Sequence, residues 1–280
     1  MSAMRRIVGR AIAYVVLLLI GLVGIAPFLY LLVLSFKRRI DIISEVPPTL
    51  HFDWAAIQAN YNEIINYQGI LTSLVNSVIV VGISTFLALV IGTPAAYAFS
   101  RLQFRGRDTW ASTILSFRFM PAVAVAVPIY LLMKAIGLTD TYPGLILPYV
   151  AFSTPLVVWI LIGFFDEIPT DLDDAARVDG CSRFQVLTRI MLPIMRPGLV
   201  VAAMFGAIFI WNEFLVALFV INSPEHSTIT LTAATLVSAQ RPIDWNIAAA
   251  TGVVTVIPIL LFSFVVQKYI VRGITSGAVR

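Results

Sequence analysis

Two charged residues, Arg118 and Glu213, stand inside long apolar stretches of the sequence. Burying a charge in such a stretch is costly, so the charge usually serves a function or is neutralised by an ion pair. At 1.5 Å per residue, Arg118 and Glu213 lie roughly 14 Å and about 21 Å from the ends of their stretches. A role in a pore or gate and a structural pairing therefore both stay open. Asn76 and Asn212 are weaker polar candidates for the same pathway.

Aromatic residues in the same stretches could bind a neutral, hydroxyl-rich solute. Sugars are held by hydrogen bonds and flat rings rather than by fixed charge. Tyr130, Trp159 and Trp211 offer such rings. Aromatic side chains in membrane helices more often pack or anchor at the interface. The three residues are therefore candidate solute contacts beside that structural alternative.

Enzymatic motifs are missing from the sequence, which contains no G-x-x-x-x-G-K-[ST], H-E-x-x-H, G-x-S-x-G or C-x-x-C pattern. Cys181 is the only cysteine, so an intramolecular disulfide and a cysteine-based metal site are excluded. His51 and His226 are isolated in polar segments. The sequence predicts no catalytic residue, metal or cofactor in this chain, and any ATP hydrolysis must occur on another polypeptide.

Membrane-spanning helices must position these residues. The chain is 59% hydrophobic and 12% charged, whereas soluble domains are about 45–50% apolar and about 25% charged. Its apolar runs are long enough to cross a hydrocarbon core of about 30 Å. We expect one all-α polytopic domain, residues 1–280, whose six spans lie near residues 11–36, 71–100, 109–136, 142–165, 199–221 and 247–271. The first run exceeds the length of a signal peptide and is interpreted as a retained span.

The basic residues predict the orientation of the chain. Most lysines and arginines lie on the side of the two termini, which the positive-inside rule places in the cytoplasm. This distribution accounts for the net charge of +4. No basic stripe is interleaved with aromatic residues, so nucleic-acid binding is not expected. We expect a multi-pass membrane protein with cytoplasmic termini.

A polar loop between the fourth and fifth spans, residues 168–197, predicts two short helices. Thr170 and Asp173 approximate a capping box, and Gly180 can supply a left-handed stop. Leu172, Ala175 and Ala176 are expected on one face. The acidic first turn, which includes Asp171 and Asp174, also complements a helix dipole.

The second helix of this loop has its own start and stop signals. Ser182 and Gln185 match a capping box. An apolar stripe of Phe184, Leu187, Ile190 and Met191 is expected to end at Pro193. Such a helix pair could dock another protein or pack on its own spans, and the pattern alone leaves both open.

The loop resembles the EAA loop of bacterial ABC importer permeases. The resemblance rests on Asp174-Ala175-Ala176-Arg177-Val178-Asp179-Gly180, then Ile190-Met191-Leu192-Pro193 and Pro197. Further segments resemble the smaller permease subunit of maltose-type carbohydrate importers, and the likeness covers nearly the whole chain. These segments are Leu34-Ser35-Phe36-Lys37, Ile136-Gly137-Leu138-Thr139-Asp140-Thr141, Trp211-Asn212-Glu213-Phe214 and Val271-Arg272-Gly273-Ile274-Thr275-Ser276-Gly277-Ala278-Val279. The family usually carries glutamate at the place of Asp174.

The resemblance implies a multi-pass permease of a bacterial inner membrane that moves a sugar or sugar-like solute from a binding protein into the cytoplasm. The partners it implies are a larger second permease, two cytoplasmic ATPase subunits that bind ATP and Mg²⁺, an extracytoplasmic solute-binding protein and the lipid bilayer. It also implies that the loop inserts into a cleft of an ATPase subunit. The coupling contacts would be Asp174, Ala175, Ala176, Asp179 and Gly180.

Two other classes of function share some of these sequence features. An ion-coupled secondary transporter would also be polytopic and carry charges within its spans, but it would not need the capped helix pair. A membrane-embedded enzyme would need a cluster of His, Cys or carboxylate residues, which the sequence does not present.

Overall fold

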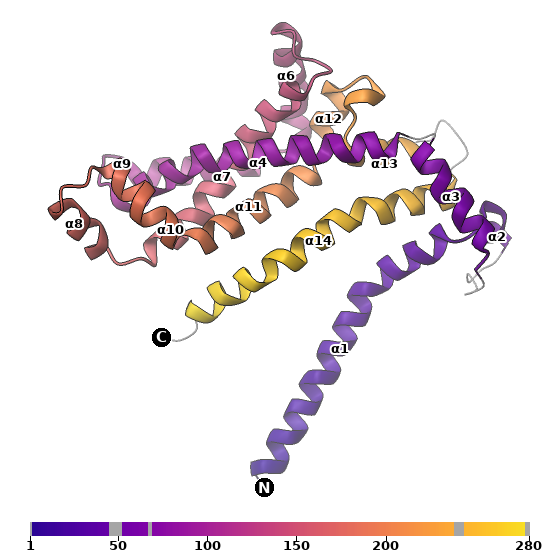
Figure 1. Cartoon of the computed structure of the whole chain (residues 1–280), viewed down its shortest axis with the longest axis horizontal. Coiled ribbons are helices and arrows are strands. Elements are labelled where there is room, and N and C mark those ends of the chain that lie inside the picture. The colour runs from indigo at the N-terminus through magenta and orange to yellow at the C-terminus, as the bar shows by residue number, and fades with distance from the viewer. Residues whose placement is uncertain (1, 45–51, 67–68, 238–243, 278–280) are drawn as a thin grey trace. The chain divides into compact units, whose positions relative to one another are not determined.

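The computed structural model of the chain describes residues 2–44, 52–66, 69–237 and 244–277 (Figure 1). Every regular element in these ranges is a helix. The chain divides into two compact units. One comprises residues 1–70 and 233–257, and the other comprises residues 71–232 and 258–280.

The first unit contains α1 (Ser2–Ser35), α2 (Arg39–Ser44), α3 (Trp54–Asn66) and the beginning of α14 (Trp245–Gly277). The amide of Asn60 on α3 donates to the backbone carbonyls of Ser35 and Lys37, at 2.9 Å each. Asn246 on α14 donates to the Asn60 carbonyl oxygen at 2.8 Å. A buried, fully used amide thus fastens the end of α1. Along residues 7–30 of α1 the apolar side chains are exposed, as suits a helix surrounded by hydrocarbon.

The second unit is built on α4 (Ile70–Arg101), α7 (Tyr142–Asp166) and α11 (Arg196–Trp211). A Cβ at Gly198 on α11 would lie only 2.7 Å from the ring of Phe164 on α7, so glycine permits this close approach. One buried cluster includes Leu161, Phe165 and Met191. A second buried cluster includes Tyr149 and Val220.

Within the described ranges, four helices are long and apolar enough to cross a membrane: Ile7–Ser35, Ile70–Arg101, Tyr142–Asp166 and Trp245–Phe264. They correspond to the first, second, fourth and sixth predicted spans. Each of these predictions is confirmed as one continuous helix. The total of six spans and the cytoplasmic position of the termini stay predictions.

The third predicted span, residues 109–136, is wrong as a continuous helix. The chain forms α5 (Arg107–Ser116), the 3₁₀ helix η1 (Phe117–Phe119) and α6 (Ala122–Ala135). Met120 adopts an extended conformation, with φ −66° and ψ 131°. The ring of Pro121 explains the break, because it disfavours helical geometry at the preceding residue.

The fifth predicted span, residues 199–221, is also wrong as a continuous helix. Helix α11 ends at Trp211, and α12 (Leu215–Val220) begins three residues later. The Asn212 side chain donates to the carbonyl of Ile208 at 2.7 Å, and the Glu213 carboxylate accepts the backbone N–H of Val216 at 3.1 Å. The Glu213 carboxylate thus supplies an acceptor for an N–H at the start of α12, and the Asn212 amide adds a second donor to a carbonyl at the end of α11, so both ends of the break are stabilised.

The loop of residues 168–197, called the elbow below, contains α8 (Asp171–Val178), α9 (Arg183–Gln185), the π-helical turn η2 (Val186–Met191) and α10 (Leu192–Ile194). Two further elements, η3 (Pro224–His226) and α13 (Ile229–Leu236), follow α12. Helices α8 and α9 lie near one end of α4, while α12 lies toward its other end (Figure 1).

Candidate functional site

Helix α8 of the elbow begins without the predicted capping box. The Thr170 side chain makes no capping hydrogen bond. Asp173 instead accepts a hydrogen bond from the Tyr97 hydroxyl at 2.6 Å and one from Arg101 Nε at 2.9 Å. A guanidinium offers a carboxylate a stronger, charge-assisted bond than a backbone N–H does, which explains why this prediction is wrong.

The end of α8 confirms the predicted stop at Gly180. Its φ is +83°, in the left-handed region that glycine adopts without strain. The N–H of Cys181 donates to the carbonyl of Ala176 at 3.0 Å, and the N–H of Gly180 donates to that of Arg177 at 3.1 Å. This pair of bonds is a Schellman motif, which fixes the direction of the chain after α8.

The second helix confirms one boundary and corrects the other. Ser182 and Gln185 form the predicted capping box, with bonds of 2.7 and 3.3 Å. The helix does not end at Pro193, which lies in the first turn of α10, where its missing N–H is tolerated. Residues 183–194 and 196–211 form two helical segments bent by 81°. The bend at Met195, and not the proline, separates the elbow from α11.

The elbow turns different side chains inward and outward than the sequence suggested. Asp173 and Ala176 are buried, whereas Leu172 and Ala175 are exposed, so only Ala176 of the three apolar residues packs inward. Phe184 is 72% exposed, while Leu187, Ile190 and Met191 pack inside. Exposed apolar residues next to carboxylates form what we call the docking face: Leu172, Asp174, Ala175, Val178, Asp179 and Phe184.

The breaks in the third and fifth predicted spans line one cavity of about 770 Å³, called the break cavity. Its wall is mostly aromatic and aliphatic, and Asn212 and Glu213 are the polar side chains in it. The aromatic lining residues are Phe117, Phe119, Phe152, Phe205, Phe209 and Phe214. The structure therefore brings two of the predicted pathway residues to a single cavity.

Glu213 is already engaged in this cavity. One carboxylate oxygen accepts a hydrogen bond from the Tyr149 hydroxyl at 2.9 Å. Both oxygens lie 3.1 Å from the backbone N–H of Val216, at the first turn of α12. A carboxylate at a helix N-terminus is favoured by the orphan N–H groups and the helix dipole there. Glu213 thus starts α12 while it faces the break cavity.

Of the other two pathway candidates, Asn76 is not among the residues that line this cavity. The side chain of Arg118 lies outside the described part of the structure, and its backbone belongs to η1. Asn76 donates to the carbonyls of Glu225 and Ser227, at 2.7 and 2.9 Å, and accepts from the Tyr142 hydroxyl at 2.7 Å. Asn76 therefore fastens the segment after α12 and does not line the break cavity.

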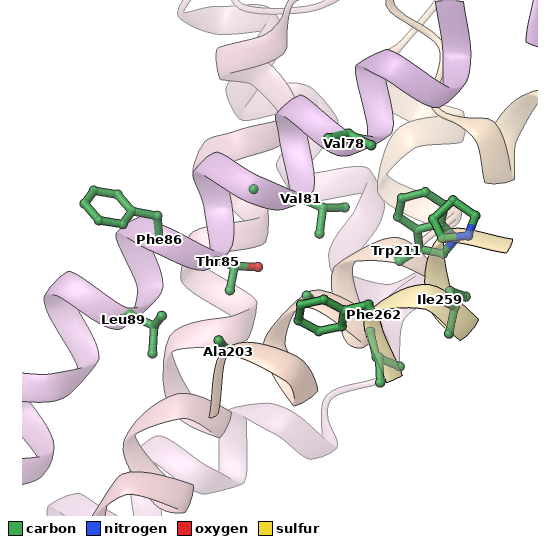
Figure 2. A pocket seen from close by; sticks show the side chains of 13 residues that line it. Val78, Val81, Thr85, Phe86, Leu89, Ala203, Trp211, Ile259 and Phe262 are labelled. Atoms are coloured by element: carbon green, nitrogen blue, oxygen red, sulfur yellow. The ribbon is translucent and has the colours of Figure 1, made fainter. Parts of the chain in front are cut away.

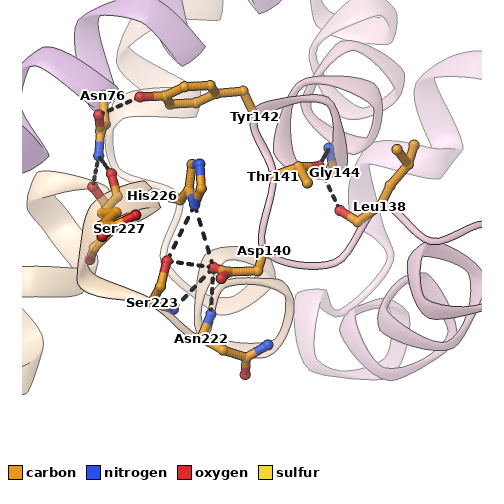
Figure 3. A network of polar contacts seen from close by, with 11 residues as sticks. Asn76, Leu138, Asp140, Thr141, Tyr142, Gly144, Asn222, Ser223, His226 and Ser227 are labelled. Atoms are coloured by element: carbon orange, nitrogen blue, oxygen red, sulfur yellow. Dashed lines mark hydrogen bonds and ion pairs between the residues drawn. The ribbon is translucent and has the colours of Figure 1, made fainter.

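Figure 3 shows this fastening and a second one at Asp140. One carboxylate oxygen of Asp140 accepts the N–H of Asn222 and both the N–H and the hydroxyl of Ser223, at 3.0–3.1 Å. His226 Nδ1 lies 3.8 Å from the same oxygen. Partial burial opposes ionisation of Asp140, but these hydrogen bonds outweigh it and lower the pKa of the carboxyl below 3.8.

The three candidate aromatic contacts lie apart. Trp211 lines an apolar cavity of about 420 Å³ between α4, α11 and α14, where it faces Thr85 (Figure 2). Among the described residues, neither Trp211 Nε1 nor Thr85 Oγ1 has a hydrogen-bond partner. Trp159 is 57% exposed on α7, and Lys134 Nζ lies 5.8 Å from the Tyr130 ring centre. The structure does not assemble these residues into one aromatic site.

Sequence reasoning missed the cluster of Tyr97, Arg101 and Asp173. In the sequence, Arg101 appears only as one of the basic residues that predict the orientation of the chain in the membrane. The available signal was its spacing, because Tyr97 and Arg101 are four residues apart and share a face at the end of α4.

The fold and these helical breaks belong to a known class of membrane protein. Residues 88–276 match the family described as the binding-protein-dependent transport system inner membrane component. The chain belongs to this family, as the resemblance of the elbow implied. Membership decides against the ion-coupled secondary transporter.

Individual relatives match over nearly their full length. The trehalose transport system permease protein SugB of Mycobacterium tuberculosis is 36% identical over 92% of this chain and 93% of its own. The trehalose/maltose transport system permease protein MalG of Thermococcus litoralis is 31% identical over 94% of each chain. The diacetylchitobiose uptake system permease protein NgcG of Streptomyces coelicolor is 33% identical over 96% of this chain and 89% of its own.

A solved structure shares the fold. It is a chain of a bacterial ABC transporter involved in the import of the acidic polysaccharide alginate, with a TM-score of 0.77 and 21% identity. The match covers 94% of this chain and 96% of that one. The overall fold of this chain is thus also found in that transporter.

Proposed function

We propose that this chain is the membrane-spanning permease subunit of an ATP-driven importer for a sugar or sugar-like solute. The chain itself is not an enzyme, and a separate subunit hydrolyses ATP. The docking face is the structural observation that carries the proposal, because a permease without a nucleotide site must receive mechanical work through such a contact.

The sugar class is supported by the relatives. Those that name a solute name trehalose, maltose, diacetylchitobiose or sulfoquinovosyl glycerol. These compounds share a polyhydroxylated saccharide part and differ in size and charge. The proposal therefore extends to the saccharide class and not to one member of it.

The docking face suits a cleft on an ATPase subunit. Val178 is 88% exposed and Leu172 is 41% exposed, and such apolar surface gains free energy when a partner covers it. The side chain of Asp174 is 73% exposed and lies 4.0 Å from Arg177, so it remains available to a basic group of the partner. Asp179 and the small Ala175 complete this face, and Gly180 sets its angle. Ala176 supports the face from inside.

The break cavity supports a pathway for solute through the second unit. The phenylalanine rings offer flat apolar surfaces to a saccharide ring, and Glu213 and Asn212 supply polar groups beside them. The assembly we propose adds a larger second permease, two ATPase subunits with ATP and Mg²⁺, and an extracytoplasmic solute-binding protein. Both termini would lie in the cytoplasm, as the positive-inside rule predicts.

Substitution of Glu213→Gln separates a transport role of this residue from a structural one. Glutamine keeps an oxygen that can accept from Tyr149 and Val216, so the amount of protein in the membrane should be unchanged. Loss of the charge should lower solute uptake. Equal losses of membrane protein and uptake would instead assign Glu213 to structure alone.

Reconstitution tests the proposed function. The chain is purified with its co-expressed partner subunits and placed in proteoliposomes with the binding protein. We expect uptake of a labelled disaccharide such as trehalose or maltose only when ATP is supplied on the ATPase side. Uptake driven by a proton or sodium gradient, with no ATPase bound, would contradict the proposal.

A further inference from the structure

Three separate segments of the second unit meet at one arginine. Arg101 is the last residue of α4. Its Nη2 donates to the carbonyls of Phe165 and Ile168, at 2.8 and 2.7 Å, where α7 has just ended. Its Nε donates to the Asp173 carboxylate on α8 at 2.9 Å. One planar guanidinium therefore ties the ends of two spans to the first helix of the elbow.

The carboxylate of Asp173 is fully used at this meeting point. Its second oxygen accepts the Tyr97 hydroxyl at 2.6 Å. The Tyr97 ring in turn packs edge-on against Phe165, with 5.6 Å between ring centres. The side chains of Arg101 and Asp173 are only 7% and 10% exposed. A buried ion pair whose hydrogen bonds are satisfied resists separation, because each partner alone would be an uncompensated buried charge.

The neighbouring carboxylate on α8 has the opposite environment. Asp174 is 73% exposed and has only a 4.0 Å contact with Arg177. Successive residues of a helix point about 100° apart, so one acidic residue faces the spans while the next faces outward. Anchoring and docking are thus divided between two adjacent side chains.

We propose that Tyr97, Arg101 and Asp173 form a clamp that passes displacement of the elbow to α4 and α7. The proposal rests on the proposed function, because it assumes that an ATPase subunit moves the elbow. Helix α8 cannot slide along the end of α4 without breaking the bond between Arg101 Nε and the Asp173 carboxylate. Motion imposed on the docking face therefore moves the ends of both spans. Arg101, Asp173 and Tyr97 are positioning residues in this scheme.

The test measures solute uptake and ATP hydrolysis in the same proteoliposomes that hold the complete transporter. Asp173→Asn keeps the size of the side chain and an acceptor for Tyr97, but it removes the charge that holds Arg101. We expect the same amount of ATPase subunit to co-purify with the variant. The uptake per ATP hydrolysed should fall by about tenfold, the factor that corresponds to about 1.4 kcal/mol of lost coupling.

Asp174→Asn is the matched control, with the same chemical change one residue away. It should lower the amount of co-purified ATPase subunit, and the complexes that do form should keep the wild-type uptake per ATP. An unchanged ratio in Asp173→Asn would overturn the clamp. So would parallel losses of membrane protein, uptake and hydrolysis at a constant ratio, since these indicate a structural role only.

Two milder variants keep the proposal falsifiable if Asp173→Asn does not accumulate in the membrane. Arg101→Lys retains the charge but replaces the planar fork, in which Nε and Nη2 reach separate acceptors, with one compact ammonium group. Tyr97→Phe removes a single hydrogen bond. The ratio should fall more in Arg101→Lys than in Tyr97→Phe, and wild-type ratios in both would refute the clamp. Absence of any ATPase subunit in the wild-type preparation would refute the proposed function instead, which separates the two failures.

Discussion

The two ends of the second unit fasten irregular backbone with carboxylates that have different partners. At the elbow, Asp173 is buried and paired with the fixed charge of Arg101. At the other end, Asp140 is about one-third exposed and is held by N–H and hydroxyl donors of Asn222 and Ser223. The first arrangement is costly to break and connects three segments. The second holds one loop through bonds that water can partly replace.

The two fastenings differ in the free energy needed to break them. A buried ion pair loses several kcal/mol when one partner is removed, whereas a partly exposed carboxylate loses much less. The elbow is therefore held to the spans by an ion pair that is costly to break. The chain after α12 is held by the weaker hydrogen bonds of Asp140.

Removal of the guanidinium at the elbow should have the largest effect. Arg101→Ala leaves Asp173 buried without a counter-charge and removes the guanidinium bonds to the carbonyls of Phe165 and Ile168. We expect a loss of about 3–5 kcal/mol in the free energy of unfolding. Thermal unfolding of the purified protein in detergent measures it. A loss no larger than that of Asp140→Asn would show that the two ends do not differ.

Substitution of Asp140→Asn should have a smaller and pH-dependent effect. Asparagine keeps one acceptor oxygen but loses the charge, so we expect a loss of about 1.5 kcal/mol at neutral pH. Because the pKa of Asp140 is lowered in the folded protein, its stabilising contribution is present above 3.8 and is lost as pH falls through the lowered value. Melting temperatures of wild type and variant should converge as the pH falls below 3.8. A constant difference over this range would contradict the assignment.

Substitution at the elbow turn should have the smallest effect. Gly180 has φ +83°, and no heavy atom lies within 4 Å of the position where a Cβ would stand. Gly180→Ala therefore costs only the strain of a left-handed alanine, about 1 kcal/mol. Thermal unfolding should show this small loss, and uptake per ATP should change less than in Asp173→Asn. A larger loss would mean that the turn is packed more tightly than the structure shows.

The sequence predicted the regular spans because a long apolar run has few alternatives in a membrane. The sequence could not show which prolines interrupt a helix and which do not. Pro27 and Pro94 lie inside continuous helices, whereas Pro121 follows a break. The difference depends on whether neighbouring segments satisfy the freed backbone groups, which is a tertiary property.

The same limit applied at the elbow. Its local signals, Gly180 and the Ser182–Gln185 box, were predicted correctly because their partners lie within a few residues. Whether Asp173 or Asp174 faces inward depends on Arg101, which lies 72 residues from Asp173 in the sequence. The roles of Glu213 and Asn76 were hidden for the same reason, since Tyr149 and Ser227 lie far from them in the chain.

Cross-linking from the docking face tests directly whether the elbow contacts an ATPase subunit. In a Cys181→Ser background, a thiol-linked photoreactive group is placed at Val178→Cys or, as the control, at Asp108→Cys, a fully exposed position on α5 outside the elbow. We expect that illumination of the complete transporter joins position 178, but not position 108, to the ATPase subunit. Labelling from position 178 that reaches only this chain or lipid would contradict it.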